Sequence, residues 1–308
     1  MQVDGNMMKS LLVGFGYWGR ILVKYIRQSD QFELTGICDP GLDHSPSLDS
    51  MLKECRLECA FVCVPVRRHY EIVHKLLEYN VHVFCEKPLC SNLKDTLQLY
   101  RLAWQKERIL FTDYIYTVSP SIRYMKDHIH MLGEIQYISM DIKQFGRFYK
   151  EDNVYEVIGV HMVSVLVFLF GISVQDDVIT AVDTLKYDNS GKAEAGVLFF
   201  KIHNVRGKIE CSLISDEKIR RIEVICENGM IVFDMLKKDT VRIIGHQEDA
   251  ETGQKIQQTI EAKQFDEKNN LCAAVEYFGN AVLSGKSEFD QLSLQTARIM
   301  EKITGGSI

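Results

Sequence analysis

The sequence predicts an α/β protein of two domains: an N-terminal doubly wound parallel sheet and a C-terminal α+β domain with a large, open, mostly antiparallel sheet. Strand-like and helix-like stretches alternate from residue 9 to about residue 118, as in a parallel sheet covered by helices. After Pro120 the pattern changes to a helix followed by several strands, some with apolar and polar residues in alternation. A chain of 308 residues is long enough for two cores, so we expect domains at 1–118 and 119–308.

Composition argues against several classes of partner and of bound group. The net charge of -6 and the pI of about 5.9 argue against binding to nucleic acid or an anionic membrane. The N-terminus lacks the basic and apolar regions of a signal peptide, and the apolar run 157–174 is too short for a membrane span, so we expect a buried helix there. Nine cysteines without a Cys-x-x-Cys pair indicate reduced thiols in a cytoplasmic protein and no metal site.

The first predicted strand, residues 9–13, runs directly into a glycine-rich turn and then a helical pattern. Strand, Gly-x-Gly-x-x-Gly and helix in this order form a dinucleotide-binding fingerprint, because the helix N-terminus can bind a pyrophosphate. Gly14 would form the tight turn, Gly16 would let the backbone approach the phosphates, and Gly19 would allow close helix packing. We expect the whole turn to contact the cofactor: Gly14, Phe15, Gly16, Tyr17, Trp18 and Gly19.

The second predicted strand, residues 32–38, ends at Asp39, twenty residues beyond Gly19. A carboxylate at this place hydrogen-bonds a ribose 2′-hydroxyl and repels a 2′-phosphate. Asp39 also begins Asp-Pro-Gly, a good turn sequence, and the two roles are compatible. Pro40 and Gly41 offer no cation for a 2′-phosphate, which favours NAD over NADP.

Further strands are predicted at 57–64, from Val81 to about Lys87, and at 109–112. A loop at 65–69 leads into a helix that reaches Leu77, and Ser91 is the expected N-cap of a helix that extends to Gln105.

The strand that begins at Val81 ends in a charged pair, Glu86 and Lys87, followed by a proline. Proline cannot donate to a sheet, so the strand should stop at about Lys87. At the carboxyl end of a parallel strand, Lys87 either is solvated or points into a cofactor crevice, and from this stretch alone a solvated lysine is the commoner case. A cis Lys87–Pro88 bond is compatible with the sequence.

In the C-terminal part a helix is expected over 121–132. The strands and helices that follow are expected at 135–145, 178–187, 193–202, 208–215, 219–226, 229–234, 269–283 and from 291.

Four motifs follow one another on this layout: the fingerprint at 14–19, Pro-x-x-x-His at 65–69, Glu-Lys-Pro at 86–88 and Gly-Val-His at 159–161. Together they resemble the Gfo/Idh/MocA family of NAD(P)-dependent oxidoreductases over nearly the whole chain. The resemblance implies a Rossmann domain and reversible hydride transfer between nicotinamide and a carbon bearing a hydroxyl group, usually on a sugar, a polyol or a nucleotide-sugar.

A narrower resemblance concerns members that act on nucleotide-linked sugars or amino sugars. It lies in Thr-Asp-Tyr at 112–114, Ser-Pro at 119–120, Asp-Asn-Val at 152–154, and the segments 161–164 and 212–221. In this interpretation one of Lys218, Arg220 and Arg221 meets a diphosphate, although such a cluster is usually a solvated strand face.

The resemblance also implies roles for individual residues. Lys87 would bind the reacting hydroxyl and exchange its proton, and His161 is the second acid–base candidate, although a histidine in an apolar helix is more often a core residue. Further cofactor contacts are expected from Val64, Pro65, His69 and Glu86, and substrate contacts from Tyr114, Tyr155 and Glu156.

One departure from the family pattern concerns the proton relay. The family usually carries Asp four residues before this His, where this chain has Val157. Glu156 is offset by one residue, which on an α-helix turns it about 100° away. The relay could use Tyr155 or Glu156, and the alternative function is a non-catalytic NAD- or sugar-sensing protein. Relatives pair through the open sheet face, so a homodimer or homotetramer is expected.

Overall fold

A computed structural model describes residues 7–146, 148, 152–172, 178–186, 192–237, 240–249, 251–265 and 270–305, which fold into two units. The first unit comprises Met1–Val118 and Lys268–Ala297, and the second comprises Ser119–Glu267 and Arg298–Gly306. The first of these units is interrupted after residue 118 and resumes at residue 268. The expected second domain, 119–308, differs from this division because the segment from 268 to 297 returns to the first unit.

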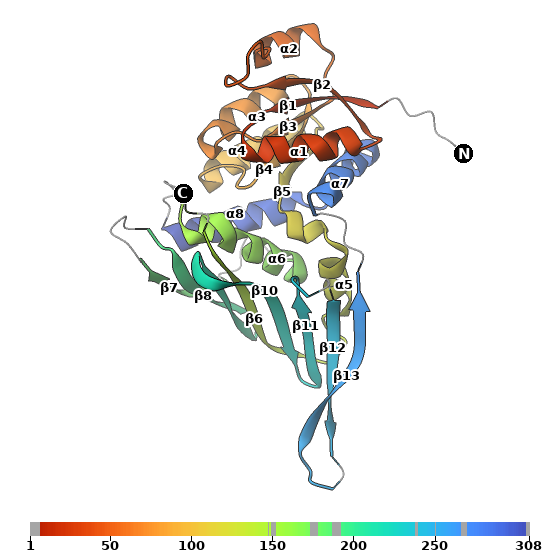
Figure 1. The fold of residues 1–308 in the computed structure, drawn as a ribbon, viewed down its shortest axis with the longest axis vertical. Helices are drawn as coiled ribbons and strands as arrows, with labels where there is room; N and C mark the ends of the chain where they lie inside the picture. Colours follow the sequence, from red (N-terminus) through yellow and green to blue (C-terminus); the bar gives the residue numbers. More distant parts are fainter. Residues whose placement is uncertain are drawn as a thin grey trace, which may run out of the picture. The chain divides into compact units, whose positions relative to one another are not determined.

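The first unit contains a parallel five-stranded sheet in the order β2-β1-β3-β4-β5 (Figure 1). Its strands are β1 (Met8–Val13), β2 (Phe32–Cys38), β3 (Cys59–Val62), β4 (His82–Glu86) and β5 (Leu110–Asp113). The predicted doubly wound parallel sheet is therefore confirmed. Strand order reverses between β1 and β3, and ligands of such sheets bind outside the carboxyl ends of the strands at this point.

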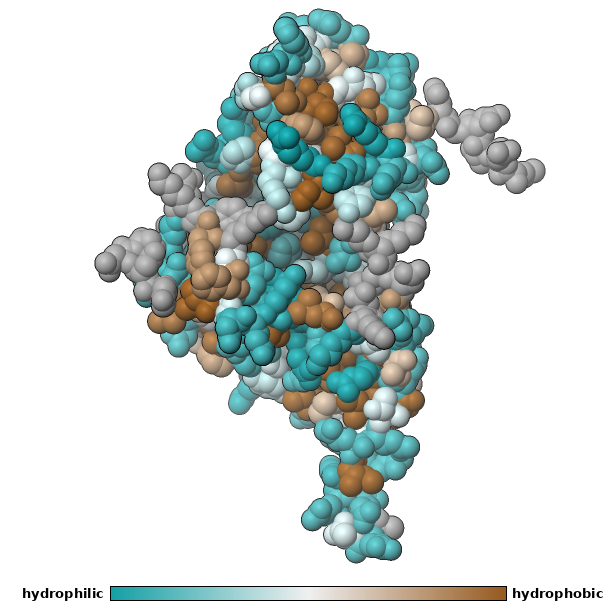
Figure 2. Space-filling view, in the orientation of Figure 1, coloured by the Kyte–Doolittle hydropathy of each residue, from teal (hydrophilic) through white to brown (hydrophobic). Residues whose placement is uncertain are grey.

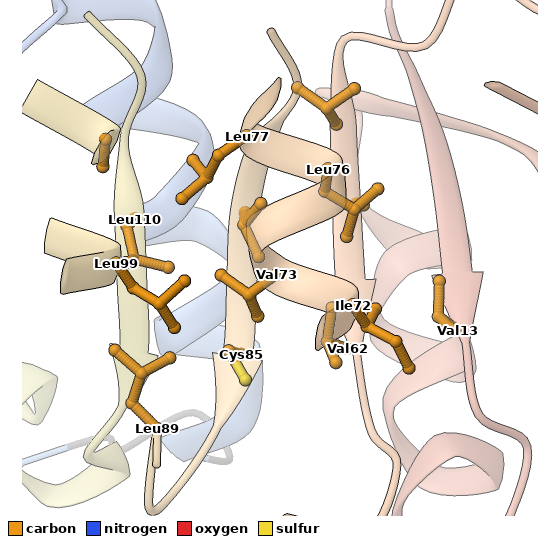
Figure 3. Packing of buried hydrophobic residues seen from close by; sticks show 14 of the residues in the cluster. Val13, Val62, Ile72, Val73, Leu76, Leu77, Cys85, Leu89, Leu99 and Leu110 are labelled. Carbon is orange, nitrogen blue, oxygen red and sulfur yellow. The ribbon is translucent and has the colours of Figure 1, made fainter. Parts of the chain in front are cut away.

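One face of this sheet is covered by helices that follow β3 and β4. The helices of the unit's N-terminal part are α1 (Tyr17–Gln28), α2 (Leu48–Glu54), α3 (His69–Glu78) and α4 (Leu93–Gln105). Figure 3 shows Val73 and Leu76 of α3 within the aliphatic core that also contains Val62 and Cys85 of the strands. This core fixes α3, and with it the loop between β3 and α3, against the sheet.

An aromatic row covers the opposite face. Phe61, Phe84 and Phe111 come from neighbouring strands, and Phe278 of α7 (Asn270–Ser284) lies 5.5 Å from Phe61 and 5.8 Å from Phe84, between ring centroids. Phe278 also stacks on Phe32. These contacts explain why α7 belongs to the first unit, because burying such rings stabilises the packing of α7 on the sheet.

The second unit is built on an eight-stranded sheet in the order β13-β12-β11-β10-β6-β9-β8-β7, and among its described strands the β6–β9 pair alone is parallel. Its strands are β6 (Ile135–Phe145), β7 (Ile179–Leu185), β8 (Ala195–Ile202), β9 (Val205–Ser212), β10 (Ile214–Cys226), β11 (Gly229–Asp234), β12 (Thr240–Glu248) and β13 (Lys255–Gln264). The expected mostly antiparallel sheet is confirmed.

The two faces of this sheet differ in character. The helices α5 (Pro120–His128) and α6 (Val160–Phe170) belong to this unit, and α6 packs on β6. On β6 the residues alternate, so Met140 and Ile142 are fully buried while Asp141 and Lys143 stay partly exposed. Lys143 pairs with Glu210 of β9 at 2.6 Å, which gives the other face a charged centre.

The elements that the sequence did not predict are α2, β12 and β13. The β12–β13 hairpin is coated mainly with hydrophilic side chains, and an isolated hydrophobic spot remains (Figure 2).

Two helix ends differ from those expected. Helix α5 ends at His128, before the expected Leu132. The N-cap of α4 is Asn92 rather than Ser91, because the Asn92 side chain accepts from the Asp95 N–H group. Residues 1–6, 173, 174, 187 and 269, on which parts of the expectations fall, lie outside the described residues.

Within the described ranges no helix is long and apolar enough to cross a membrane. The last helix, α8 (Asp290–Thr304), begins beside Trp104, whose indole N–H donates to Asp290 at 2.7 Å. All nine cysteines are free thiols.

Candidate functional site

The three fingerprint glycines differ in what surrounds them. Gly14 has φ +96°, and a Cβ there would lie 2.5 Å from the Cys63 carbonyl oxygen. A Cβ on Gly19 would collide with the Gly14 carbonyl oxygen, whereas one on Gly16 would meet no atom of the described residues within 4 Å. The turn is therefore tight at Gly14, closely packed at Gly19 and open at Gly16, which fits the approach of a pyrophosphate to the backbone.

The N-terminus of α1 also fits an anion. Its N-cap is Gly16, which offers no side-chain acceptor to the first-turn N–H groups, and the first turn, described throughout, holds no acidic residue. The positive end of the helix dipole adds to the attraction for phosphate. Tyr17 and Trp18 follow with rings that are 54% and 46% exposed and 5.3 Å apart.

Asp39 at the end of β2 holds two loops by its carboxylate. One oxygen accepts from the Phe15 N–H group and the other accepts from the Gly41 N–H group at 2.7 Å. Asp39 is thus the turn residue that Asp-Pro-Gly indicates, and it also ties the fingerprint to the carboxyl end of β2. The Phe15 amide points to Asp39, while its ring lies under the guanidinium of Arg20 at 5.0 Å.

The strand β4 ends at Glu86, one residue before the predicted end, and the Lys87–Pro88 bond is cis. Because β1, β3 and β4 are neighbours in a parallel sheet, their carboxyl ends lie along one edge. The structure therefore brings to one edge of the first unit the fingerprint, Asp39, Val64, Pro65, Glu86 and Lys87.

His69 has a different position from the one expected. It is 1% exposed, and its ring nitrogens lie 2.9 Å from the Pro88 oxygen and 2.8 Å from the Val64 oxygen. Burial lowers the pKa of His69, while hydrogen bonds to backbone carbonyl groups act in the opposite direction. The ring is engaged by backbone on both sides, so it positions the loops after β3 and β4 and does not itself offer a nitrogen to a cofactor.

A buried carboxyl pair lies beside Lys87. Glu86 and Asp113 are register partners in β4 and β5, and Asp113 is 1% exposed. Burial raises the pKa of Glu86 to about 7 and raises that of Asp113 well above its usual range, while the charge of Lys87 lowers both. The sequence reasoning gave Asp113 no role of its own, although its spacing from Phe111 repeats that of Glu86 from Phe84.

In the second unit, a π-helical turn (Tyr155–Gly159) precedes α6. The Val160 N–H group donates to the Tyr155 oxygen five residues earlier, which is the π-helical pattern. A π turn has more residues per turn than an α-helix, so it brings Glu156 closer to the face of His161 than α-helical spacing would. The one-residue offset that counts against Glu156 is therefore smaller in this structure.

The carboxylate of Glu156 also closes a capping box with Asn153. It accepts from the Asn153 N–H group at 2.7 Å, and the Asn153 side chain accepts from the N–H groups of Tyr155 and Glu156. His161 is partly exposed at the start of α6, where the Ser164 hydroxyl donates to its backbone oxygen.

Two expected substrate contacts are enclosed. Tyr155 is 2% exposed and its hydroxyl donates to the Asp183 oxygen at 2.8 Å, and Tyr114 is 3% exposed. Each of them is therefore enclosed within the fold of its own unit. The Arg220 guanidinium is buried and donates to the Lys143 oxygen at 2.8 Å, while Arg221 pairs with Glu223, so neither is poised for a diphosphate.

Comparison with known proteins shows which family the N-terminal part of the chain is similar to. Residues 8–114 match the sequence model of the oxidoreductase family with an NAD-binding Rossmann fold, GFO_IDH_MocA. Among curated proteins, a 2,7-anhydro-N-acetylneuraminate hydratase from Mediterraneibacter gnavus is 25% identical over 138 residues, which cover 41% of this chain and 37% of that protein. The match thus spans well under half the length of this curated relative.

Two solved structures share the fold over nearly the full length. One is the UDP-N-acetylglucosamine 3-dehydrogenase GnnA from Acidithiobacillus ferrooxidans, with a TM-score of 0.82, 17% identity and 98% of each chain covered. The other is KijD10, a 3-ketoreductase from Actinomadura kijaniata in complex with TDP-benzene and NADP, with a TM-score of 0.79, 16% identity and 98% of each chain covered. Groups of three or more His, Cys, Asp or Glu side chains able to hold a metal are absent from the described residues.

Proposed function

We propose that this chain, whose residues 8–114 match the Gfo/Idh/MocA oxidoreductase family model, transfers hydride reversibly between a nicotinamide cofactor and a secondary alcohol or ketone of a sugar or nucleotide-sugar. The observation that carries the proposal is the shared sheet edge: the open Gly16 turn and Lys87 lie at the carboxyl ends of β1 and β4, which β3 separates in one parallel sheet. A lysine at that edge can act on a substrate beside a bound nicotinamide.

A bound nicotinamide dinucleotide supplies the hydride chemistry. The Gly16 turn and the N-terminus of α1 bind its pyrophosphate, and Asp39 accepts from a ribose hydroxyl. Lys87 binds the reacting hydroxyl of the substrate and moves its proton at Nζ, which a side chain within hydrogen-bond reach can do. His161, supported by Glu156, is the second acid–base residue.

The cofactor we favour is NAD. The carboxylate of Asp39 disfavours a 2′-phosphate by charge, and Pro40 and Gly41 bring no cation to offset it. Titrating the protein with NADH and with NADPH, by the change in nicotinamide fluorescence, tests this choice. Tighter binding of NADPH would overturn it.

Nucleotide-sugars are the substrate class we put first. The likeness of fold to GnnA and KijD10 covers both units of this chain. GnnA is a UDP-N-acetylglucosamine 3-dehydrogenase, and KijD10 is a 3-ketoreductase in complex with TDP-benzene and NADP. The resemblance at 112–114, 119–120 and 152–154 to the nucleotide-sugar branch points the same way.

The deciding experiment follows NADH absorbance with NAD⁺ and a panel of sugars and nucleotide-sugars. We expect reduction of NAD⁺ with one substrate class and its loss in Lys87→Ala, while NADH binding persists. Lys75→Ala is the matched control, because this lysine forms a surface ion pair with Asp49. Unchanged turnover in Lys87→Ala would refute the assigned mechanism.

The alternative is a non-catalytic NAD- or sugar-sensing protein, and Val157 in place of the usual Asp is the observation that favours it. Tight NADH binding without turnover on any member of the panel would support this alternative.

We also propose a cytoplasmic homodimer or homotetramer that pairs through the open face of the eight-stranded sheet. Sedimentation at micromolar concentration tests it, and a monomer alone would contradict it. Neither proposal includes nucleic acid or a membrane as partner.

A further inference from the structure

Three titratable side chains extend the aromatic row of the parallel sheet toward its carboxyl edge. Each of them, Cys63, Glu86 and Asp113, lies two residues after a phenylalanine of that row. Side chains two residues apart on a strand point to the same face, so Glu86 and Asp113, which lie within β4 and β5, share the face that α7 covers. The register of β4 and β5 sets Glu86 directly beside Asp113.

The carboxyl groups of Glu86 and Asp113 differ in exposure, and the buried one lacks hydrogen bonds. Asp113 is 1% exposed, and within the described residues neither of its carboxyl oxygens has a hydrogen-bond partner. Glu86 retains partial exposure. A buried carboxylate without hydrogen bonds is costly, and two adjacent carboxylates cannot both ionise in such a place. A stable arrangement needs one proton on the pair.

We propose that Glu86 and Asp113 share one proton and that Asp113 is a positioning residue, which makes this pair the proton acceptor behind Lys87. The inference rests on the proposed function, in which Lys87 exchanges the proton of the substrate hydroxyl.

Proton transfer through the pair balances in the direction of alcohol oxidation. Lys87 passes one of its protons to the carboxylate of the pair, and its neutral amine then takes the hydroxyl proton as the O–H bond breaks. A bound nicotinamide would take the hydride, with the electron pair of the C–H bond on the same carbon, as the C=O bond forms. Lys87 keeps its charge, the pair becomes neutral, and Glu86, the partly exposed member, returns the proton to solvent.

The groups around the pair agree with this assignment. Lys87 is the cation that acts on both carboxyls, and it lowers the pKa of each against the larger effect of burial. The Cys63 thiol stays neutral, because burial first and then Glu86 raise its pKa. From α7, the titratable Tyr277 packs on Phe111 at 5.3 Å between ring centroids. The acceptor capacity of the pair should therefore change near pH 7.

Infrared difference spectroscopy on the full chain without cofactor tests the shared proton directly. We expect a protonated carboxyl band in the wild type at pH 8, above the pKa of Glu86, and its loss in Asp113→Asn, with the band retained in the surface control Asp49→Asn. Asp113→Thr serves if Asp113→Asn does not fold. Absence of the band in the wild type, or its persistence in the Asp113 variants, would overturn the inference.

The pH profile of alcohol oxidation tests the relay. In the wild type we expect kcat/KM to rise with pH, with a midpoint near pH 7. At that pH Glu86 loses its proton and its carboxylate can accept one. In Asp113→Asn the midpoint should shift, because Glu86 no longer shares a proton with a second carboxyl. Suppose that Asp113→Asn keeps the wild-type pH midpoint and that its activity still requires Lys87. That result would refute the shared proton and leave the proposed function standing. Turnover that survives in Lys87→Ala would refute the proposed function. In that case the infrared measurement still shows whether Glu86 and Asp113 share a proton.

Discussion

The imidazole of His69 lies between the backbone oxygens of Val64 and Pro88, at 2.8 and 2.9 Å. These oxygens belong to the loops after β3 and β4, so one side chain connects the two strand ends that border the candidate site. Both oxygens only accept, and a neutral imidazole has one N–H group. At neutral pH His69 therefore donates to one loop and contacts the other, and protonation would let it donate to both.

Replacing His69 should loosen both loops. We expect His69→Ala to lower the free energy of unfolding by about 3 kcal/mol, since it leaves a cavity and removes a donor from a buried carbonyl. Urea unfolding measures this loss, and NADH titration shows whether the edge around Lys87 is disturbed. His74→Ala on the exposed side of the same helix is the control. Equal stability of the two variants would contradict the connecting role.

His69 also has a pH signature. Burial lowers its pKa in the folded state, so the unfolded chain takes up the proton first as the pH falls. Stability should decline below about pH 6.5, the ordinary histidine pKa, until the pH passes the lowered folded value. Unfolding curves at pH 7 and 5 measure this decline, and a wild-type decline unchanged in His69→Ala would assign it to other groups.

Glu86 predicts a pH dependence of the opposite sign. Its pKa is raised from 4.5 to about 7, so the stability that it contributes is fully present below pH 4.5 and is lost as the pH rises through 7. At pH 8 we expect Glu86→Gln to be more stable than the wild type by up to about 3 kcal/mol, and the difference should vanish near pH 4. Urea unfolding at both pH values provides the measurement. If Glu86→Gln changes the free energy of unfolding by the same amount at both pH values, this account is refuted. Glu78→Gln is the exposed control.

Asp39 should matter for cofactor binding through the fingerprint. Asp39→Asn exchanges one carboxylate acceptor for an amide donor, so it breaks the bond from either Phe15 or Gly41. We expect NADH to bind roughly ten-fold more weakly, in line with the loss of one hydrogen bond to a charged group. Fluorescence titration measures this, with Asp49→Asn as the matched surface control. Unchanged affinity would mean that the turn keeps its shape without Asp39.

The π turn predicts which acidic residue supports His161. Glu156→Gln keeps the size of the side chain and removes its charge, so we expect a loss of turnover of about ten-fold or more and a shifted pH profile. Val157→Asp should not restore it, because Glu156 is the expected partner of His161. Recovery of activity in the double variant Glu156→Gln/Val157→Asp would show that position 157 can support His161 instead.

Much of the fold followed from local patterns. β2, β6 and β11 have the bounds that the sequence predicted, because apolar alternation and turn residues delimit them. β12 and β13 were missed because the segment 240–264 is rich in Gln, Glu and Lys, and all but one of the β13 residues are exposed. A strand without a buried face carries little periodic signal.

The candidate site was only partly predictable. Gly14, Gly16 and Gly19 form the turn that their spacing indicates, since backbone geometry at those positions depends on the glycines themselves. Asp113 and the π turn before His161 were missed for physical reasons: the first depends on strand register and the second on a backbone hydrogen bond, and neither leaves a motif in the sequence.

The position of Phe278 has a consequence for synthesis of the protein. The rings of Phe32, Phe61, Phe84 and Phe111 leave the ribosome more than 150 residues before the ring that covers them. During that interval a nascent chain carries an uncovered aromatic surface, the kind of surface that chaperones bind and that promotes aggregation. A fragment that stops at residue 118 would keep this exposure permanently, so the isolated N-terminal part should be poorly soluble although its sheet is complete.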